Sequence, residues 1–264
     1  MLSQGARPVG YDDRGAGAAV VLLHPFPFSR GIWAGLSDVL ATRHRVIAVD
    51  ARGFGESPLT STPRYSLADL ADDLAALLDG LQIQRAALLG MSMGGYTALA
   101  FAARHPTRLA ALALADTRAA GDRAETRAAR QTALALVRAD GVEAYLAGSL
   151  GRLLSPAAPP ALVAHCRARA ETRAPSLIAG IEALRDRPDR TGELGAIACP
   201  TLIICGATDQ VVPVAEMRGM AEAIPGAAFA EIPEAGHLAH LEAPAAFERT
   251  LSPFLAATAE GNRS

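Results

Sequence analysis

The sequence contains no lysine: its 25 lysine and arginine positions are all arginine. Schiff-base catalysis and the phosphate-binding P-loop both need a lysine, so neither is possible here. Only three cysteines are present, Cys166, Cys199 and Cys205, and their irregular spacing fits neither a disulfide framework nor a zinc site. No histidine pair has metal-ligand spacing. We therefore expect no metal and no cofactor.

The sequence also lacks an excess of charge of either sign, with a formal net charge of −2. A nucleic-acid partner is not expected, because it would require a basic surplus. Residues 1–7 contain no apolar stretch of a signal peptide. The uncharged run Ala86 to Ala103 has the length of a membrane span, but Gly90, Gly94 and Gly95 divide it into a strand and a helix. We expect a cytoplasmic protein without a membrane partner. Its oligomeric state is left open.

Strand and helix patterns alternate along most of the chain. Short apolar runs typical of buried parallel strands are Ala19–Leu23, Val46–Val49, Ala86–Leu89, Leu109–Ala115, Thr201–Cys205 and Ala227–Ile232. Between them lie amphipathic stretches such as Ser66–Leu81. The early segment Val9–Val21, broken by Gly15-Ala16-Gly17, is typical of a hairpin at an antiparallel sheet edge. The alternation predicts an α/β fold, with a mostly parallel, doubly wound sheet of about eight strands.

Residues 117–190 interrupt this alternation with helical patterns only. The expected helices are Arg123–Arg138, Val142–Leu154 and Pro160–Ala174. We predict a helical cap inserted after the sixth strand, with residues 1–116 and 191–264 forming the core. The insertion holds 12 arginines and eight acidic residues. These charges fit solvated helix faces, and alternatively a mildly positive lid for anionic substrates.

The strongest motif is Gly90-Met91-Ser92-Met93-Gly94, which directly follows an apolar strand and opens a helical stretch. A serine on such a strand-to-helix turn is held in a strained conformation with its hydroxyl exposed above the sheet. The helix N-terminus also favours negative charge at this position. We predict that Ser92 is a nucleophile.

An activated serine needs a base and an orienting acid. Asp209 and His237 each follow a predicted strand, in the chain order serine, acid, histidine. Asp116 also follows a strand and is the alternative acid. His240 begins the helix predicted over Leu238–Leu255, so we assign it to packing or exposure and not to catalysis.

The oxyanion hole is predicted from the loop His24-Pro25-Phe26-Pro27-Phe28. Proline has no N–H, so only Phe26 and Phe28 among the residues after His24 can donate, and Phe26 is nearer to the strand. The second donor is expected to be the backbone amide of Met93, the residue after the nucleophile. His24 heads this loop and is assigned to bracing its backbone.

Together these residues resemble the α/β-hydrolase superfamily over essentially the whole chain. The motifs that carry the resemblance are His24-Pro25-Phe26-Pro27, Asp50-Ala51-Arg52-Gly53-Phe54-Gly55-Glu56-Ser57, the Ser92 turn, Gly206–Asp209, Gly236-His237-Leu238 and Leu241-Glu242-Ala243-Pro244. Pro25 departs from the family, which usually has glycine there, but it leaves the Phe26 amide intact. Ser92 argues against haloalkane dehalogenases and epoxide hydrolases, which carry aspartate at this position.

The resemblance is to small cofactor-free members such as carboxylesterases, 3-oxoadipate enol-lactonases and haloperoxidase-like perhydrolases. It implies a serine hydrolase that cleaves carboxylic esters of small to medium acyl groups through an acyl-enzyme. One alternative is an enol-lactone or C–C bond hydrolase for an anionic ring-cleavage product, which the cationic insertion and Arg118 would suit. Another is a binding protein without turnover on the same scaffold. The expected partner is a small-molecule ester or lactone.

Overall fold

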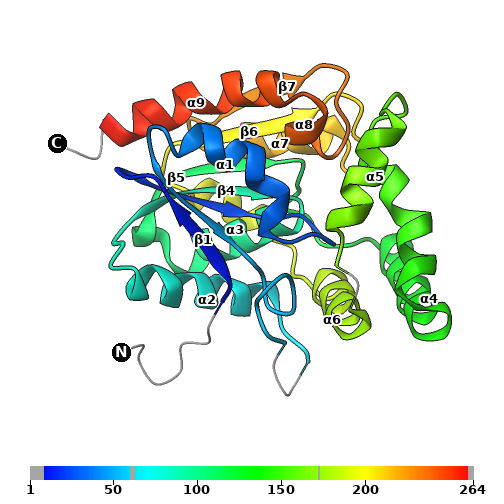
Figure 1. Ribbon diagram of the computed structural model, residues 1–264. Helices are drawn as coiled ribbons and strands as arrows, with labels where there is room; N and C mark the ends of the chain where they lie inside the picture. Colours follow the sequence, from blue (N-terminus) through cyan, green and yellow to red (C-terminus); the bar gives the residue numbers. More distant parts are fainter. Residues whose placement is uncertain (1–8, 60–62, 172, 261–264) are drawn as a thin grey trace.

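The computed structural model describes residues 9–59, 63–171 and 173–260; residues 1–8, for which no signal peptide was predicted, lie outside them. One sheet forms the centre of the molecule (Figure 1). Its strands are β1 (Tyr11–Arg14), β2 (Ala19–Leu23), β3 (Arg45–Val49), β4 (Ala86–Met91), β5 (Leu109–Ala115), β6 (Thr201–Gly206) and β7 (Ala228–Ile232). The spatial order is β1-β3-β2-β4-β5-β6-β7, with β1 antiparallel and every other pair parallel.

The predicted mostly parallel α/β sheet is confirmed, but its strand count differs. The described residues form seven strands where we expected about eight, and the insertion follows the fifth strand instead of the sixth. The hairpin expected over Val9–Val21 is also wrong. β1 pairs with β3, and β3 separates it from β2. Gly15 (φ 75°) packs directly on the backbone carbonyls of Ala41 and His44, so the bend carries the chain across the sheet edge.

Helices cover both faces of the sheet (Figure 1). The α-helices are α1 (Ala34–Leu40), α2 (Leu67–Gly80), α3 (Met93–Arg104), α4 (Ala124–Ser149), α5 (Pro160–Arg169), α6 (Ala174–Arg185), α7 (Val214–Ala223), α8 (Ala239–Glu242) and α9 (Pro244–Glu260). Short 3₁₀ helices are η1 (Arg30–Trp33), η2 (Pro106–Arg108), η3 (Leu150–Leu153) and η4 (Thr191–Ala196). No helix in the described part of the chain combines the length and apolar character needed to cross a bilayer.

The two faces of the sheet build two separate apolar clusters. Side chains alternate along a strand, so Val21 on β2 joins the cluster of α2, α3 and α7, while its neighbour Leu22 joins that of α1 and α9. Helix α2 begins with a capping box, in which Ser66 and Asp69 each accept from the other's backbone amide. The uncharged stretch 86–103 forms β4 and α3, as predicted.

The insertion is helical between β5 and β6, as predicted, and its divisions differ in part. The break predicted between the first two helices is confirmed at Gly141 (φ 83°), where the backbone leaves helical geometry and the two parts of α4 meet at a kink. A further helix, α6, begins with Pro175 in its first turn, a position that proline tolerates. The single helix expected over Leu238–Leu255 is instead α8 and α9, interrupted before Pro244 because proline disfavours helical backbone in the preceding residue.

Candidate active site

The turn between β4 and α3 holds Ser92. Its backbone lies at φ 51° and ψ −112°, a conformation that is unfavourable for a residue with a side chain. Two glycines allow the turn. A Cβ on Gly94 would lie 2.0 Å from the carbonyl oxygen of Leu23 on β2, and a Cβ on Gly90 would lie 2.4 Å from that of Gly94. The serine therefore sits where the sheet ends, at the start of a helix.

The structure brings the three predicted catalytic residues together. The His237 Nε2 atom lies 2.8 Å from Ser92 Oγ, and Nδ1 lies 2.8 Å from Asp209 Oδ2. The side chains of His237 and Asp209 are 1% and 0% exposed, so this pair is shielded from water. An Nδ1–H that donates to the carboxylate leaves Nε2 free to accept the serine proton. Chemically, this arrangement suits a base that deprotonates Ser92.

The loop after β6 fixes the direction of Asp209. Its Oδ1 accepts hydrogen bonds from the backbone amides of Val211 (2.7 Å) and Val212 (3.1 Å), which leaves Oδ2 for the imidazole. The loop is tied to the one that carries His237. Both the amide and the hydroxyl of Thr208 donate to the carbonyl of Ala235, each at 2.9 Å. These bonds set the relative position of acid and base.

Asp116, the alternative acid, has its carboxyl group beside the end of β6, and among the described residues no hydrogen bond joins it to His237. Its Oδ1 accepts from the backbone amide of Gly206 at 2.7 Å, and its side chain is fully buried. Burial, and in addition the nearby Asp209 carboxylate, raise the pKa of Asp116 well above its usual range. Burial thus favours the neutral form of this carboxyl, and the hydrogen bond to His237 is made by Asp209 instead.

His24 braces the loop after β2. The backbone amide of Ala51 donates to its Nε2 at 3.0 Å, so Nδ1 carries the proton and donates to the carbonyl of Pro25 at 3.1 Å. Burial lowers the pKa of His24, which keeps this neutral form. The side chain thus links the loop after β2 to the loop after β3.

The same loop presents the first predicted oxyanion donor. The Phe28 amide donates to the carbonyl of Pro25 at 3.0 Å, whereas the Phe26 amide has no acceptor among the described residues. Met93 is the first residue of α3, so its amide has no partner within the helix. The Phe26 ring packs against Tyr145 of the insertion, with centroids 6.2 Å apart. Neither amide therefore has an acceptor in the described part of the chain, and an aromatic contact with the insertion holds the Phe26 ring.

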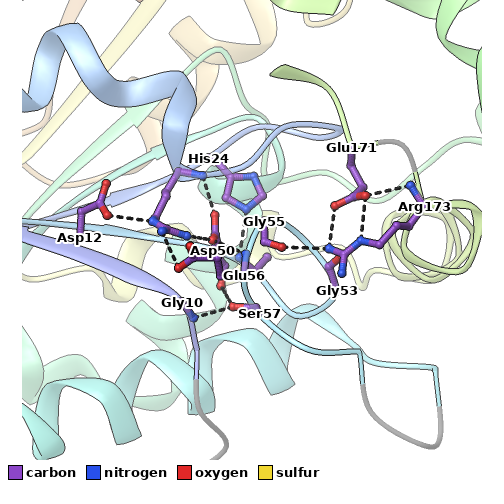
Figure 2. Close-up of polar contacts among 12 residues, drawn as sticks. Gly10, Asp12, His24, Asp50, Gly53, Gly55, Glu56, Ser57, Glu171 and Arg173 are labelled. Atoms are coloured by element: carbon purple, nitrogen blue, oxygen red, sulfur yellow. Dashed lines mark hydrogen bonds and ion pairs between the residues drawn. The ribbon is translucent and has the colours of Figure 1, made fainter. Parts of the chain in front are cut away.

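A polar network under this loop was not predicted from the sequence (Figure 2). The Asp50 carboxylate is buried and accepts from the amides of Arg30 (2.7 Å) and Glu56 (2.9 Å), and from the Arg30 guanidinium. Gly55 (φ 52°) has no room for a side chain because a Cβ would lie 2.2 Å from Asp50 Oδ2. In the sequence, the acid and the glycines of the Asp50–Ser57 motif are the signal of this network.

The insertion contacts this network through Arg173, which lies just before α6 (Figure 2). Arg173 donates to the carbonyls of Gly53 (2.7 Å) and Gly55 (3.1 Å). The amide of Glu171 donates to the carbonyl of Pro27 at 2.8 Å, and Pro27 is the residue after the predicted oxyanion donor Phe26. The insertion therefore contacts the loops after both β2 and β3.

The other histidines make structural contacts. His240 is buried against Trp33, with ring centroids 4.4 Å apart, and burial lowers its pKa to about 3. It packs inside the fold, one of the two roles we expected. His105 lies 2.8 Å from an Asp72 oxygen, and His165 contacts a neighbouring arginine of α5. Within the described ranges, no group of His, Cys, Asp and Glu side chains is placed to hold a metal ion.

The arginines of the insertion are largely paired with acids. Arg187 and Arg130 both bind the buried Asp122. Arg118, the candidate for an anionic substrate, donates to the carbonyl of Val211 and lies 3.4 Å from Glu216. These contacts favour the structural interpretation of the insertion's charge over the positive lid.

The chain is similar to known proteins that include esterases and an enol-lactonase. A pimeloyl-[acyl-carrier protein] methyl ester esterase from Chromobacterium violaceum is 34% identical over 91% of this chain and 95% of its own length. The structure of a thermophilic esterase from Thermogutta terrifontis superposes with a TM-score of 0.90, at 34% identity, covering 95% of this chain and 93% of the esterase. An enol-lactonase from Burkholderia xenovorans gives a TM-score of 0.86 at 30% identity, covering 94% and 96%.

The family match spans most of the chain. The profile described as alpha/beta hydrolase fold matches residues 18–244, which include both the sheet from β2 onward and the helical insertion. With the sheet order, the strand-to-helix turn and the relatives above, it leads to one conclusion: the chain belongs to the α/β-hydrolase family.

Proposed function

We propose that this protein is a serine hydrolase that cleaves carboxylic esters of small to medium acyl groups through an acyl-enzyme. Ser92 is the nucleophile, His237 the general base and acid, and Asp209 the orienting carboxylate. The observation that carries the proposal is the position of the imidazole, 2.8 Å from both the hydroxyl and the carboxylate. The two relatives named as esterases support an ester as the substrate class.

In this mechanism His237 removes the proton of Ser92 as Oγ attacks the ester carbonyl. The amides of Phe26 and Met93 donate to the tetrahedral oxyanion, where preorganised donors have their largest effect. His237 then transfers the proton to the leaving alcohol. A water molecule, deprotonated by the same imidazole, attacks the acyl-enzyme and releases the acid. Asp209 holds the imidazole tautomer and stabilises the imidazolium in both steps.

The insertion, residues 117–190, acts as a cap domain in this proposal, and residues 1–116 with 191–264 form the catalytic core. The support is its contact with the loop of Phe26. Tyr145 packs on the Phe26 ring, and a Cβ on Gly180 would lie 2.7 Å from that ring. The contact between the insertion and the Phe26 loop is therefore apolar and aromatic, which suits an uncharged acyl group if the substrate binds there.

The enol-lactone alternative keeps the same chemistry and differs in substrate. The similarity to the enol-lactonase favours it, whereas the pairing of Arg118 with Glu216 removes the cation that would have bound an anionic product. Short p-nitrophenyl esters should be assayed beside an enol-lactone. A much higher kcat/KM for the lactone would replace the ester proposal.

The proposal is tested by removing the nucleophile. Ser92→Ala should lower kcat on a p-nitrophenyl ester by roughly 10⁴-fold or more. A fluorophosphonate should label the wild type and not this variant. The control is Ser252→Ala, which removes a hydroxyl bound to Glu248 on α9 and should leave kcat unchanged. Near wild-type turnover by Ser92→Ala would refute the assignment. Labelling of the wild type without turnover of any ester or lactone would indicate a binding protein.

A further inference from the structure

Glu242, at the end of α8, joins two segments that lie far apart in the sequence. Its Oε1 accepts from the backbone amide of Gly236 at 2.8 Å, and its Oε2 accepts from that of Ser155 at 2.7 Å. Gly236 directly precedes His237, and Ser155 belongs to the insertion, between η3 and α5. One carboxylate therefore connects the loop of the base to the insertion.

The two segments are in direct backbone contact at this point. A Cβ on Gly236 would lie 2.5 Å from the Ser155 nitrogen, 2.7 Å from the Leu154 carbonyl carbon and 2.9 Å from Glu242 Oε1. These separations are below any van der Waals contact, so only glycine fits. A shift of the insertion at Ser155 would therefore move the backbone next to His237.

The same corner of the insertion reaches the loop of the acid. Gln210, which follows Asp209, donates from its side-chain amide to the carbonyl of Leu154 at 3.4 Å. The Leu154–Ser155 segment thus contacts both loops that hold the His237–Asp209 pair. Of the two hydrogen bonds that this segment makes to the loops, the one from the Ser155 amide has a charged acceptor, the Glu242 carboxylate. Hydrogen bonds to charged acceptors are the stronger kind.

We propose that Glu242 is a positioning residue that holds the insertion and the His237 loop together, so that the placement of the imidazole depends on the docking of the insertion. The inference rests on the proposed function, because His237 is the base there. A carboxylate is suited to this role because each of its oxygens accepts from one amide. Glutamine has one acceptor oxygen, and its NH₂ group would face a second donor.

The test compares Glu242→Gln with Glu248→Gln, a carboxylate on α9 whose hydrogen-bond partner among the described residues is the Ser252 hydroxyl. Glu242→Gln should lower kcat on p-nitrophenyl acetate about tenfold to a hundredfold, as expected when a catalytic group is misplaced, with KM little changed. The rate at which a small fluorophosphonate labels Ser92 should fall in parallel. Hydrogen exchange should accelerate in peptides that cover Ser155 and Gly236. Glu248→Gln should change none of these values.

A second variant separates the effect of moving the His237 loop from the effect of removing the Glu242 charge. The Glu242 charge adds to burial in raising the pKa of Cys166 to about 11, so Glu242→Gln also alters the local field. Gly236→Ala keeps the carboxylate and inserts a methyl group between the loop and the insertion. It should reproduce the loss of kcat and of labelling rate, and it stands in for Glu242→Gln if that variant does not fold.

The outcomes decide between the two proposals. If Glu242→Gln lowers only the melting temperature, while folded protein is labelled and exchanges like the wild type, Glu242 merely stabilises the fold and the inference is wrong. If wild-type protein neither hydrolyses esters nor labels at Ser92, the proposed function fails instead. The exchange of the Ser155 and Gly236 peptides then still shows whether Glu242 joins the two segments.

Discussion

The loops after β5 and β6 each present an aspartate at the same edge of the sheet, and only one of them contacts the imidazole. Asp116 follows β5 at once, and the Gly206 amide of the neighbouring strand binds it in a buried position. Asp209 lies beyond the end of β6, on a loop whose own amides hold one oxygen and leave the other for His237. The second oxygen of Asp116 is buried without a hydrogen-bond partner among the described residues, whereas that of Asp209 lies 2.8 Å from the imidazole. Distance from the strand end therefore separates the carboxylate that reaches His237 from the one that does not.

Of the changes at these two loops, Asp209→Asn should have the largest effect and lower kcat by about 10⁴-fold, because the amide no longer selects the productive imidazole tautomer. Steady-state turnover of a p-nitrophenyl ester at neutral pH measures it. Asp116→Asn is the matched control at the neighbouring strand end and should lose less than about tenfold, since this carboxyl does not contact His237. A larger loss at Asp116 would reverse the comparison.

Asp116→Asn should also change how stability depends on pH. Burial and the Asp209 carboxylate raise the pKa of Asp116 in the folded protein. The stability that comes from its neutral form is therefore complete below the unfolded pKa of about 3.9 and is lost as pH rises toward the raised value. Asparagine does not ionise, so the free energy of unfolding of the variant should increase relative to wild type between about pH 4 and pH 7.

Urea denaturation at both pH values measures this difference. Stability curves of Asp116→Asn and wild type that run parallel with pH would contradict a neutral Asp116.

The smallest effect is expected at the contact between the acid and base loops. Thr208→Val removes the hydroxyl bond to the Ala235 carbonyl and leaves the amide bond in place. The loss should be about 1 kcal/mol of unfolding free energy, or roughly 2–4 °C in Tm, with only a minor change in kcat. Calorimetry measures the shift. An activity loss as large as that of Asp209→Asn would show that the hydroxyl does more than join the loops.

Much of the core was predictable because its strands are short apolar runs with clear ends. The runs at 19–23, 86–89 and 201–205 each became a parallel strand. The pairing of β1 was not predictable, because periodicity shows that a strand exists and not which strand lies beside it. The insertion was divided correctly at Gly141, whereas the helix α6 was not expected, because whether a segment that contains Pro175 becomes helical depends on packing that the local pattern does not contain.

The predicted residues Ser92, His237 and Asp209 lie together because each follows a strand of one parallel sheet, a relation that the sequence order already contains. The contacts of Glu242 and Arg173 were missed because their partners are backbone groups 87 and about 120 residues away. Backbone acceptors and donors leave no residue-type signal in a single sequence.

Trp33 is the single tryptophan of the chain, and its ring lies fully buried against His240, three residues beyond His237. The intrinsic fluorescence of Trp33 therefore reports on α8, the short helix that follows His237. A shift of the Trp33 emission maximum on inhibitor binding would show that the packing of α8 against η1 changes when the site is occupied. An unchanged spectrum would show that this side of the protein stays fixed while the chemistry proceeds.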